Sequence, residues 1–235
     1  MSSNKPGNKP ANGKLFVISG PSGAGKTSLM QSICLRDTLL KHAVSTTTRP
    51  PRPGEVDGQD YHFVTRAVFQ EQANQQNGQK NGAGGFLSST TVFGYEYGIS
   101  RAAVENCLHR CENVLLILDV KGACDVMEIM PHDAVSIFIL PPSPDEMRRR
   151  LCVRGDDTRP DFHQRLASAS QEIRSCHLFK YLVVNDTFDD ALADVLAIIA
   201  TEKPQDAPAI AKARAVELLT IKERLINTVA TPFLL

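Results

Sequence analysis

The sequence has no excess of charge of either sign, no long apolar run and no C-x-x-C motif. Its 26 basic residues balance 26 acidic ones in a chain of 235 residues, so composition offers no electrostatic reason to expect binding to nucleic acid. No stretch approaches the roughly 18 apolar residues of a membrane span. The six cysteines include no C-x-x-C pair, which favours reduced thiols. We therefore expect a cytoplasmic protein with neither nucleic acid nor membrane as its partner.

The most informative segment that is present is Gly20–Thr27, which fits the pattern G-x-x-x-x-G-K-[ST]. It follows the apolar run Leu15–Ile18 and precedes a helix-like stretch with Leu29, Ile33 and Leu35, which is the context that a P-loop requires. A glycine-rich turn that only caps a helix is the plainer alternative. In a P-loop, consecutive N–H groups bind phosphate, the lysine reaches the β- and γ-phosphates, and the threonine hydroxyl ligates Mg²⁺.

The pattern therefore predicts a site for a nucleoside triphosphate with Mg²⁺ as cofactor. Its residues are Gly20, Pro21, Ser22, Gly23, Ala24, Gly25, Lys26 and Thr27, with Thr27 as the expected metal ligand.

Short apolar runs alternate with amphipathic stretches along much of the chain. The runs at 114–118, 135–140 and 181–184 are each followed by a helical pattern, at 122–130, 144–153 and 189–201. This alternation is typical of a parallel sheet that is covered by helices on both faces. In such sheets, ligands bind beyond the carboxyl ends of the strands. The sequence therefore predicts an α/β fold with its site at the P-loop and at Asp119, which follows one of the runs.

Three segments differ in composition from this pattern. Residues 44–101 are rich in Thr, Arg, Gly and Tyr, include the strand-like piece 61–64, and are expected to form an inserted substrate lobe; within it, Gln70–Gly85 is a low-complexity stretch expected to be a flexible loop. Residues 1–13 carry no apolar signal segment and are expected to be a disordered tail. Beyond Lys203-Pro204, residues 204–235 are expected to be a helical extension.

The extension contains one amphipathic helix, expected from Ala207 to Val229. The residues that it offers for packing are Ala211, Ala215, Leu218, Leu219 and Leu225.

A second chemical signal lies in the loop Ser45–Glu55. Arg49 and Arg52 stand three apart in a proline-rich segment, and guanidinium groups bind phosphate in a bidentate manner. Tyr61 and Tyr97 follow, and their hydroxyls are neutral donors. A solvated basic loop is the plainer alternative, but the combination favours a site for a second phosphate.

With both of these segments, the chain resembles the guanylate kinase family, whose members transfer the γ-phosphoryl group of ATP to GMP (and dGMP). The resemblance runs from Lys14 to Lys203 and implies a P-loop core, a GMP-binding lobe and a lid at about residues 153–166. The segments that carry it are Ser19–Lys26, Thr47–Glu55, Phe93 with Tyr97–Gly98, Leu118–Asp119, Phe138–Ser143, Arg149–Gly155 and Val184–Asp186.

The resemblance also implies roles for individual residues. Catalysis falls to Lys26, Asp119 and two arginines of the lid region, Arg154 and Arg165, which would stabilise charge on the phosphoryl group in flight. The positions that correspond to the GMP site are Ser45, Arg49, Arg52, Glu55, Tyr61, Ser88, Tyr97 and Asp119.

Three of the family's usual residues are missing at the base-binding positions. Ser88 stands where the family usually has a Glu that binds the guanine edge, Ile99 replaces a Ser or Thr, and Ile117 replaces the first acid of an Asp-x-Asp pair. These changes spare the phosphate-binding residues. Either another side chain such as Glu71 or Glu96 reaches the base, or a water molecule bridges from Ser88, or base selectivity is reduced.

We therefore expect a guanylate kinase that uses ATP and GMP. A kinase of the same fold with a relaxed or different phosphorylated acceptor is the first alternative. A non-catalytic binding module is the second, although such a module has no need of Lys26 and Thr27. The sequence leaves a homo-oligomeric assembly open.

Overall fold

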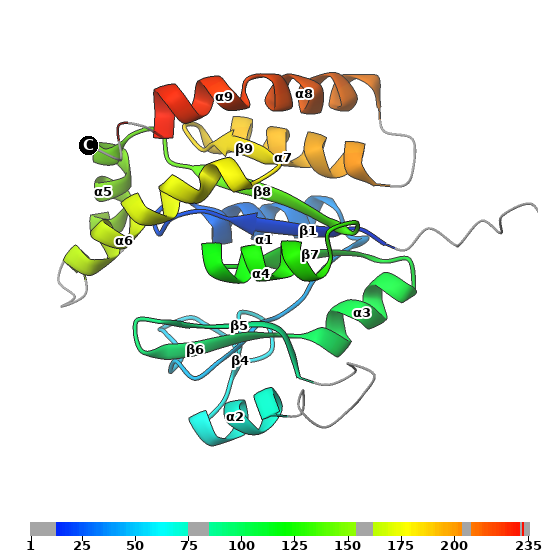
Figure 1. Ribbon diagram of the computed structural model, residues 1–235, viewed down its shortest axis with the longest axis vertical. Helices are drawn as coiled ribbons and strands as arrows, with labels where there is room; N and C mark the ends of the chain where they lie inside the picture. The colour runs from blue at the N-terminus through cyan, green and yellow to red at the C-terminus, as the bar shows by residue number, and fades with distance from the viewer. Residues whose placement is uncertain (1–12, 75–84, 154–161, 204–207, 231, 233–235) are drawn as a thin grey trace, which may run out of the picture.

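The computed structural model describes residues 13–74, 85–153, 162–203, 208–230 and 232 (Figure 1). The side chains of Val153 and of residues 162–166 lie outside this description. The expected tail 1–13 and the lid region 153–166 therefore fall largely among residues that are not described. Among the described residues, none of the helices has the length and apolar character needed to cross a membrane.

A five-stranded parallel sheet forms the centre of the molecule. Its strand order is β2-β7-β1-β8-β9, and each of its pairings is parallel. Because both faces of this sheet are covered, four of its strands are largely apolar runs instead of alternating ones, whereas the edge strand Leu40–His42 is not. The α/β fold expected from the sequence is confirmed. The strands are β1 (Leu15–Ser19), β2 (Leu40–His42), β7 (Asn113–Ile117), β8 (Ala134–Leu140) and β9 (Tyr181–Val184).

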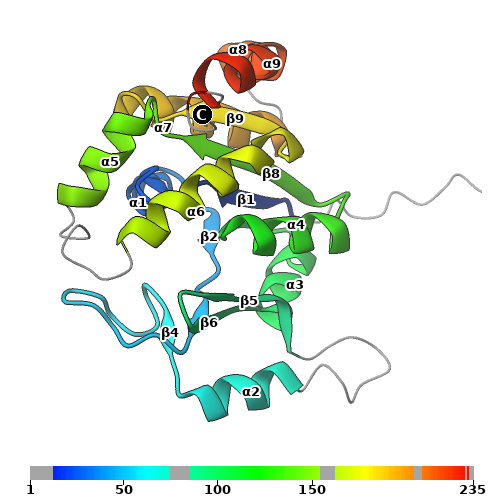
Figure 2. The ribbon, with the colours of Figure 1, turned by 60° about the vertical axis from the view of Figure 1, so that its left-hand side comes forward.

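Two helical layers cover the sheet, as both views show (Figures 1 and 2). Alternate residues of β1 serve the two cores: Phe16 and Ile18 pack toward α1, α7 and α8, whereas Leu15 and Val17 pack toward α3, α4, α5 and α6. The helices are α1 (Lys26–Arg36), α3 (Arg101–His109), α4 (Val120–Ile129), α5 (Pro144–Val153), α6 (Phe162–Arg174), α7 (Phe188–Glu202) and α8 (Ala209–Thr220).

A second, four-stranded sheet lies beside the core, below it in Figure 2, with the order β4-β3-β6-β5. It falls within residues 44–101. The two-residue turn between β5 and β6 has positive φ at both Phe93 (49°) and Gly94 (81°), which matches the twist of a tight hairpin. The elements are β3 (Thr46–Thr47), β4 (His62–Phe63), α2 (Arg66–Asn74), β5 (Phe86–Val92) and β6 (Tyr95–Ser100).

The register of this second sheet decides which side chains share a face. Thr90 lies opposite Tyr97, and Ser88 lies opposite Ile99. Because side chains alternate along a strand, these four residues all belong to one face of the sheet. That face is turned toward the P-loop side of the molecule, as the cavity described below demonstrates.

The C-terminal segment differs from the single helix expected from Ala207 to Val229. Helix α8 ends at Thr220, and the short α9 (Lys222–Leu225) and the π-helix η3 (Ile226–Ala230) follow. Ala215, Leu218 and Leu225 are buried, but Leu219 is 40% exposed. The expectation that Leu219 packs is wrong, because the buried stripe is too narrow to include it. The segment η2 (Ser175–Leu178) joins α6 to β9.

An ion pair fixes α8 to the core. Arg214 donates to both carboxylate oxygens of Asp194 on α7, at 2.6 and 2.9 Å, and Asp194 is only 8% exposed. A bidentate pair of this kind is geometrically specific, so it sets the position of α8 along α7.

Candidate active site

The loop between β1 and α1 has a backbone that only glycine accommodates. Gly20, Gly23 and Gly25 have φ angles of 143°, 83° and 90°. A Cβ atom at Gly20 would lie 2.3 Å from the carbonyl oxygen of Ile139, and one at Gly25 would lie 2.3 Å from Nδ2 of Asn185. The loop therefore packs against β8 and Asn185 more closely than any side chain allows.

Asn185 holds this loop from the end of β9. Its amide Nδ2 donates to the carbonyl oxygen of Ala24 at 2.8 Å, and its backbone N–H donates to Leu140 O at 2.8 Å. The side chain is 5% exposed. Asn185 was not among the site residues expected from the sequence, although its position directly after β9, which pairs with β8, was a signal that it could reach the loop.

Lys26 opens α1 and bends back over its own loop. Its Nζ donates to the carbonyl oxygens of Gly20 at 2.5 Å and Pro21 at 2.9 Å. The first turn of α1 contains no acidic residue, so the positive end of the helix dipole is not neutralised there. Backbone N–H groups, a helix N-terminus and an ammonium group together form a site for phosphate.

A cavity of about 400 Å³ runs from this loop to the second sheet. Its residues come from the P-loop, from residues 44–101, which contain the second sheet, and from core elements near these two. They are Gly20, Ser22, Gly23, Gly25, Lys26, Thr27, Ser45, Arg52, Tyr61, Ser88, Thr90, Val92, Phe93, Tyr97, Gly98, Ile99, Ile117, Leu118, Asp119, Gly122 and Glu172.

Arg49 lies behind the cavity wall and is 7% exposed. Its Nη2 donates to both carboxylate oxygens of Glu55, at 2.8 and 2.9 Å, and Nη1 donates to Pro50 O at 2.7 Å. Its guanidinium carbon lies 5.3 Å from the centre of the Tyr61 ring. Arg49 therefore links the proline-rich loop to the tyrosine that lines the cavity.

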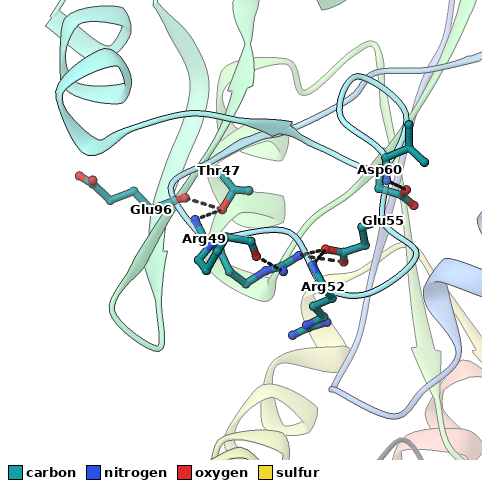
Figure 3. A network of polar contacts seen from close by, with 8 residues as sticks. Thr47, Arg49, Arg52, Glu55, Asp60 and Glu96 are labelled. Carbon is teal, nitrogen blue, oxygen red and sulfur yellow. Dashed lines mark hydrogen bonds and ion pairs between the residues drawn. The ribbon is translucent and has the colours of Figure 1, made fainter.

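Glu55 organises the same loop from the other side. Besides pairing with Arg49, it accepts a hydrogen bond from the backbone N–H of Arg52 at 2.7 Å. Figure 3 shows the Arg52 side chain extending away from the Arg49–Glu55 pair, and Arg52 lines the cavity. The loop is thus held by its buried arginine and presents the other one.

Two tyrosines complete this end of the cavity. The rings of Tyr61 and Tyr97 are 5.9 Å apart in an edge-on arrangement. Burial, together with the neighbouring Tyr97, raises the pKa of the Tyr61 hydroxyl, although Arg49 acts in the opposite direction. Tyr61 therefore stays protonated and is a neutral donor. Arg52, Tyr61 and Tyr97 form an end of the cavity that suits a dianionic phosphate.

Asp119 connects the core to the second sheet through hydrogen bonds to both. It caps the N-terminus of α4, where Oδ1 accepts from the N–H of Gly122 at 2.9 Å, and its Oδ2 accepts from the hydroxyl of Thr90 on β5 at 3.1 Å. Nearby, the hydroxyl of Ser88 donates to Oδ2 of Asp125 at 3.0 Å. Both hydroxyls lie on the cavity face of the second sheet.

Comparisons of the sequence with known proteins identify one family. The family model described as guanylate kinase matches residues 12–202. A guanylate kinase of Thermus thermophilus is 46% identical over 195 residues, which cover 83% of this chain and 83% of that protein. One of Alkalilimnicola ehrlichii is 46% identical over 191 residues, or 81% of this chain and 90% of that protein. The crystal structure of guanylate kinase from Anaplasma phagocytophilum matches with a TM-score of 0.65 and 29% identity, over 94% of this chain and 97% of that one.

The chain belongs to the guanylate kinase family. The positions at which it departs from the resemblance all belong to the cavity wall. Ser88, Ile99 and Ile117 all line it, and Ile99 is 1% exposed.

Neither of the two glutamates considered as replacements is among the described residues that line the cavity. Glu96 accepts from Arg66 and Gln70 on the other side of the sheet, and Glu71 is exposed on α2.

The remaining predicted residues of this guanylate kinase family member are distributed as follows. Ser45, which directly precedes β3, lines the cavity, as Arg52 does. Arg154 lies outside the described residues. Arg165 belongs to α6, but its side chain is also outside the description.

Glu172 is a cavity residue that sequence reasoning missed. It projects from α6 into the wall that also contains Lys26 and Asp119. Burial raises the pKa of the Glu172 carboxyl, Asp119 adds to this, and Lys26 opposes it. A carboxyl group with a raised pKa beside a phosphate site is a feature that only the folded structure reveals.

Proposed function

We propose that the two substrates of a guanylate kinase meet in this single cavity, with ATP at the P-loop and GMP at the second sheet. The chain is an ATP-dependent nucleoside monophosphate kinase of that family, which transfers the γ-phosphoryl group of ATP to GMP and gives GDP and ADP. The observation that carries the arrangement is the continuity of the cavity. Lys26 and Thr27 line one end of it, and Arg52, Tyr61 and Tyr97 line the other.

At the donor end, the P-loop binds the phosphates of ATP through its backbone N–H groups. Lys26, which now donates to two carbonyl oxygens of its own loop, exchanges them for oxygens of the β- and γ-phosphates. The phosphoryl group passes directly from ATP to GMP without a covalent bond to the protein, so positioning and positive charge provide most of the catalysis. Asn185 supports this role because it fixes the loop at Ala24.

At the acceptor end, Arg52, Tyr61 and Tyr97 bind the phosphate of GMP. Arg49 and Glu55 hold this set in place, since Glu55 accepts both from the Arg49 guanidinium and from the backbone of Arg52. Ser45, Ser88 and Asp119 lie toward the nucleoside. A rigid loop reduces the entropy that is lost when the phosphate binds.

We also propose the division of the chain that the family resemblance implies. Residues 14–203 form the catalytic unit, with an acceptor lobe at about 44–101 and a lid at about 153–166, and residues 204–235 form an extension. In this division Arg154 and Arg165 of the lid region stabilise charge on the γ-phosphoryl group, and lid closure excludes water from the site.

Mg²⁺ fits the donor end as a companion of ATP. Magnesium prefers oxygen ligands and is commonly held by one or two protein groups together with substrate phosphates and water. The Thr27 hydroxyl lines the cavity next to Lys26, so it can provide such a group. Bound there, the ion would neutralise charge on the β- and γ-phosphates. We place the enzyme in the cytoplasm, in agreement with its composition.

The test is a nucleotide panel with ATP and Mg²⁺, in which ADP release is followed by a coupled assay and the phosphorylated product is identified by chromatography. GMP should give GDP and should be turned over faster than AMP, UMP and IMP. GMP is ruled out as the substrate if it yields no more turnover than AMP. A Lys26→Met variant, assayed in parallel, separates true transfer from contaminating kinases.

A further inference from the structure

Two hydroxyl groups at the nucleoside end of the cavity each donate their one proton to a carboxylate. The Ser88 hydroxyl donates to Asp125 at 3.0 Å, and the Thr90 hydroxyl donates to Asp119 at 3.1 Å. A hydroxyl has one proton and two lone pairs. What Ser88 and Thr90 still offer to the cavity is therefore lone pairs alone.

The partners of these hydroxyls fix the direction of both bonds. Asp119 also accepts from the N–H of Gly122 at 2.9 Å, and Asp125 also accepts from the ammonium group of Lys121 at 3.1 Å. An ionised carboxylate can only accept, so each proton must come from the hydroxyl. Donation to a carboxylate also polarises the hydroxyl oxygen and strengthens it as an acceptor.

Apolar groups border this pair of acceptors. Ile99 lies opposite Ser88 in the sheet, and Ile117 and Leu118 also line the cavity. Ser88 is 8% exposed. In such surroundings an unsatisfied polar group is costly, so the ring that occupies this end must match the direction of the hydrogen bonds.

The position of the pair relative to the phosphate site is set by the sheet. Thr90 lies directly opposite Tyr97, one of the phosphate-binding residues, and Ser88 lies two positions further along β5, which is about 7 Å. When the phosphate is held by Arg52, Tyr61 and Tyr97, the base extends toward Ser88.

We propose that Ser88 and Thr90 form an acceptor-only pair that selects a purine with N–H donors on its edge, as guanine has at N1 and at its 2-amino group. Asp125 is a positioning residue in this scheme, because it holds the Ser88 proton and so prevents Ser88 from donating to a base. The inference rests on the proposed function of the cavity. In this proposal, the neutral hydroxyl of Ser88 accepts the hydrogen bond that a charged side chain would otherwise accept, and Asp125, outside the cavity, supports it.

Three nucleotides test the pair: GMP, IMP, which keeps N1–H but lacks the 2-amino group, and AMP, whose N1 is an acceptor. For the wild type, kcat/KM should fall in the order GMP, IMP, AMP. Ser88→Ala should lower kcat/KM for GMP by about tenfold and leave the value for AMP unchanged. Ser89→Ala is the matched control, since Ser89 is exposed on the opposite face of β5.

Asp125→Ala is the decisive variant, because it frees the Ser88 proton while Ser88 itself remains. The GMP-to-AMP ratio of kcat/KM should fall by about tenfold, through a gain for AMP as well as a loss for GMP. Lys121→Ala should leave the ratio unchanged, since the Ser88–Asp125 bond remains. Calorimetric titration of GMP and AMP gives the same ratio without turnover.

A ratio that Asp125→Ala moves by less than twofold would overturn the inference. If the wild type phosphorylates GMP well, such a result leaves the proposed function standing. If the wild type neither binds nor phosphorylates GMP, the proposed function fails and this inference fails with it.

Discussion

The acceptor side of the cavity has a proposed phosphate end and a proposed nucleoside end, which are built from different chemistry. The phosphate end combines Arg52, Tyr61 and Tyr97 and is supported by the buried pair Arg49–Glu55. The nucleoside end consists of hydroxyls and aliphatic side chains, and its charges lie at Asp119 and, outside the cavity, at Asp125. Charge-assisted hydrogen bonds are roughly twice as strong as neutral ones. The difference indicates that the phosphate end provides most of the affinity and the nucleoside end provides the selectivity.

The largest expected effect is a loss of kcat at the P-loop. It tests the premise of the comparison, which is that the same P-loop acts whichever acceptor nucleotide is bound. Lys26→Met removes the ammonium group that we propose to bind the transferred phosphate, so kcat should fall by about 10²- to 10³-fold with GMP and AMP alike. The coupled ADP assay measures this. Lys41→Met, an exposed lysine on β2, is the control. A loss confined to one acceptor would contradict the premise.

The next variant weakens the phosphate end alone. Glu55→Gln keeps the shape of the side chain but removes the charge that pairs with Arg49 and accepts from the Arg52 backbone. We expect KM for GMP to rise by about tenfold and KM for ATP to stay unchanged in initial-rate measurements. Glu105→Gln, in the Arg101–Glu105 pair on α3, should change neither constant. An unaltered KM for GMP would show that the pair does not organise the phosphate site.

A smaller change disturbs the nucleoside end without removing a polar group. A Cβ atom at Gly122 would lie 2.9 Å from Oδ1 of Asp119 and 3.3 Å from Oγ of Ser88. Gly122→Ala should therefore displace both and lower the GMP-to-AMP selectivity by a few-fold. Here KM for ATP serves as the internal control. If selectivity stays intact, the nucleoside end tolerates movement of Asp119 and Ser88.

The smallest effect concerns stability and a third part of the cavity, where Glu172 of α6 lies in the wall near Lys26 and Asp119. Burial holds the pKa of Glu172 above its ordinary value of 4.5. Between that value and the raised one, the folded chain binds more protons than the unfolded chain, so stability falls as pH rises. Glu172→Gln should therefore increase the free energy of unfolding at pH 7, and the difference should shrink toward pH 4.

Urea unfolding at the two pH values measures this difference. Glu128→Gln, exposed on α4, is the matched control. A Glu172→Gln variant that is less stable than the wild type at pH 7 would mean that the ionised carboxylate contributes to the fold.

The features that depend on residues close together in the chain could be predicted from the sequence. The P-loop and the loop from Ser45 to Glu55 are each a continuous segment of the sequence. Their glycines, prolines and arginines therefore indicate phosphate binding without knowledge of the fold. The central strands are largely apolar runs, which made the parallel sheet predictable. The end of the helix after Ala207 was less predictable because helix boundaries depend on packing.

The nucleoside end could not be predicted because its bonds join distant residues. Ser88 and Asp125 are 37 positions apart, Thr90 and Asp119 are 29 apart, and Asn185 reaches Ala24 over 161 positions. In the sequence Ser88 was visible only as a missing glutamate. Its donation to Asp125, which gives the hydroxyl a direction, exists only once β5 lies against α4.

The central claim is that the two ends of the cavity act separately, and it is tested most directly by kcat/KM for GMP and AMP in Arg52→Ala and Ser88→Ala. We predict that Arg52→Ala lowers both values by the same factor, about ten- to a hundredfold, so that their ratio is preserved. Ser88→Ala should lower the value for GMP alone. A ratio that changes in Arg52→Ala, or one that is preserved in Ser88→Ala, would contradict the account.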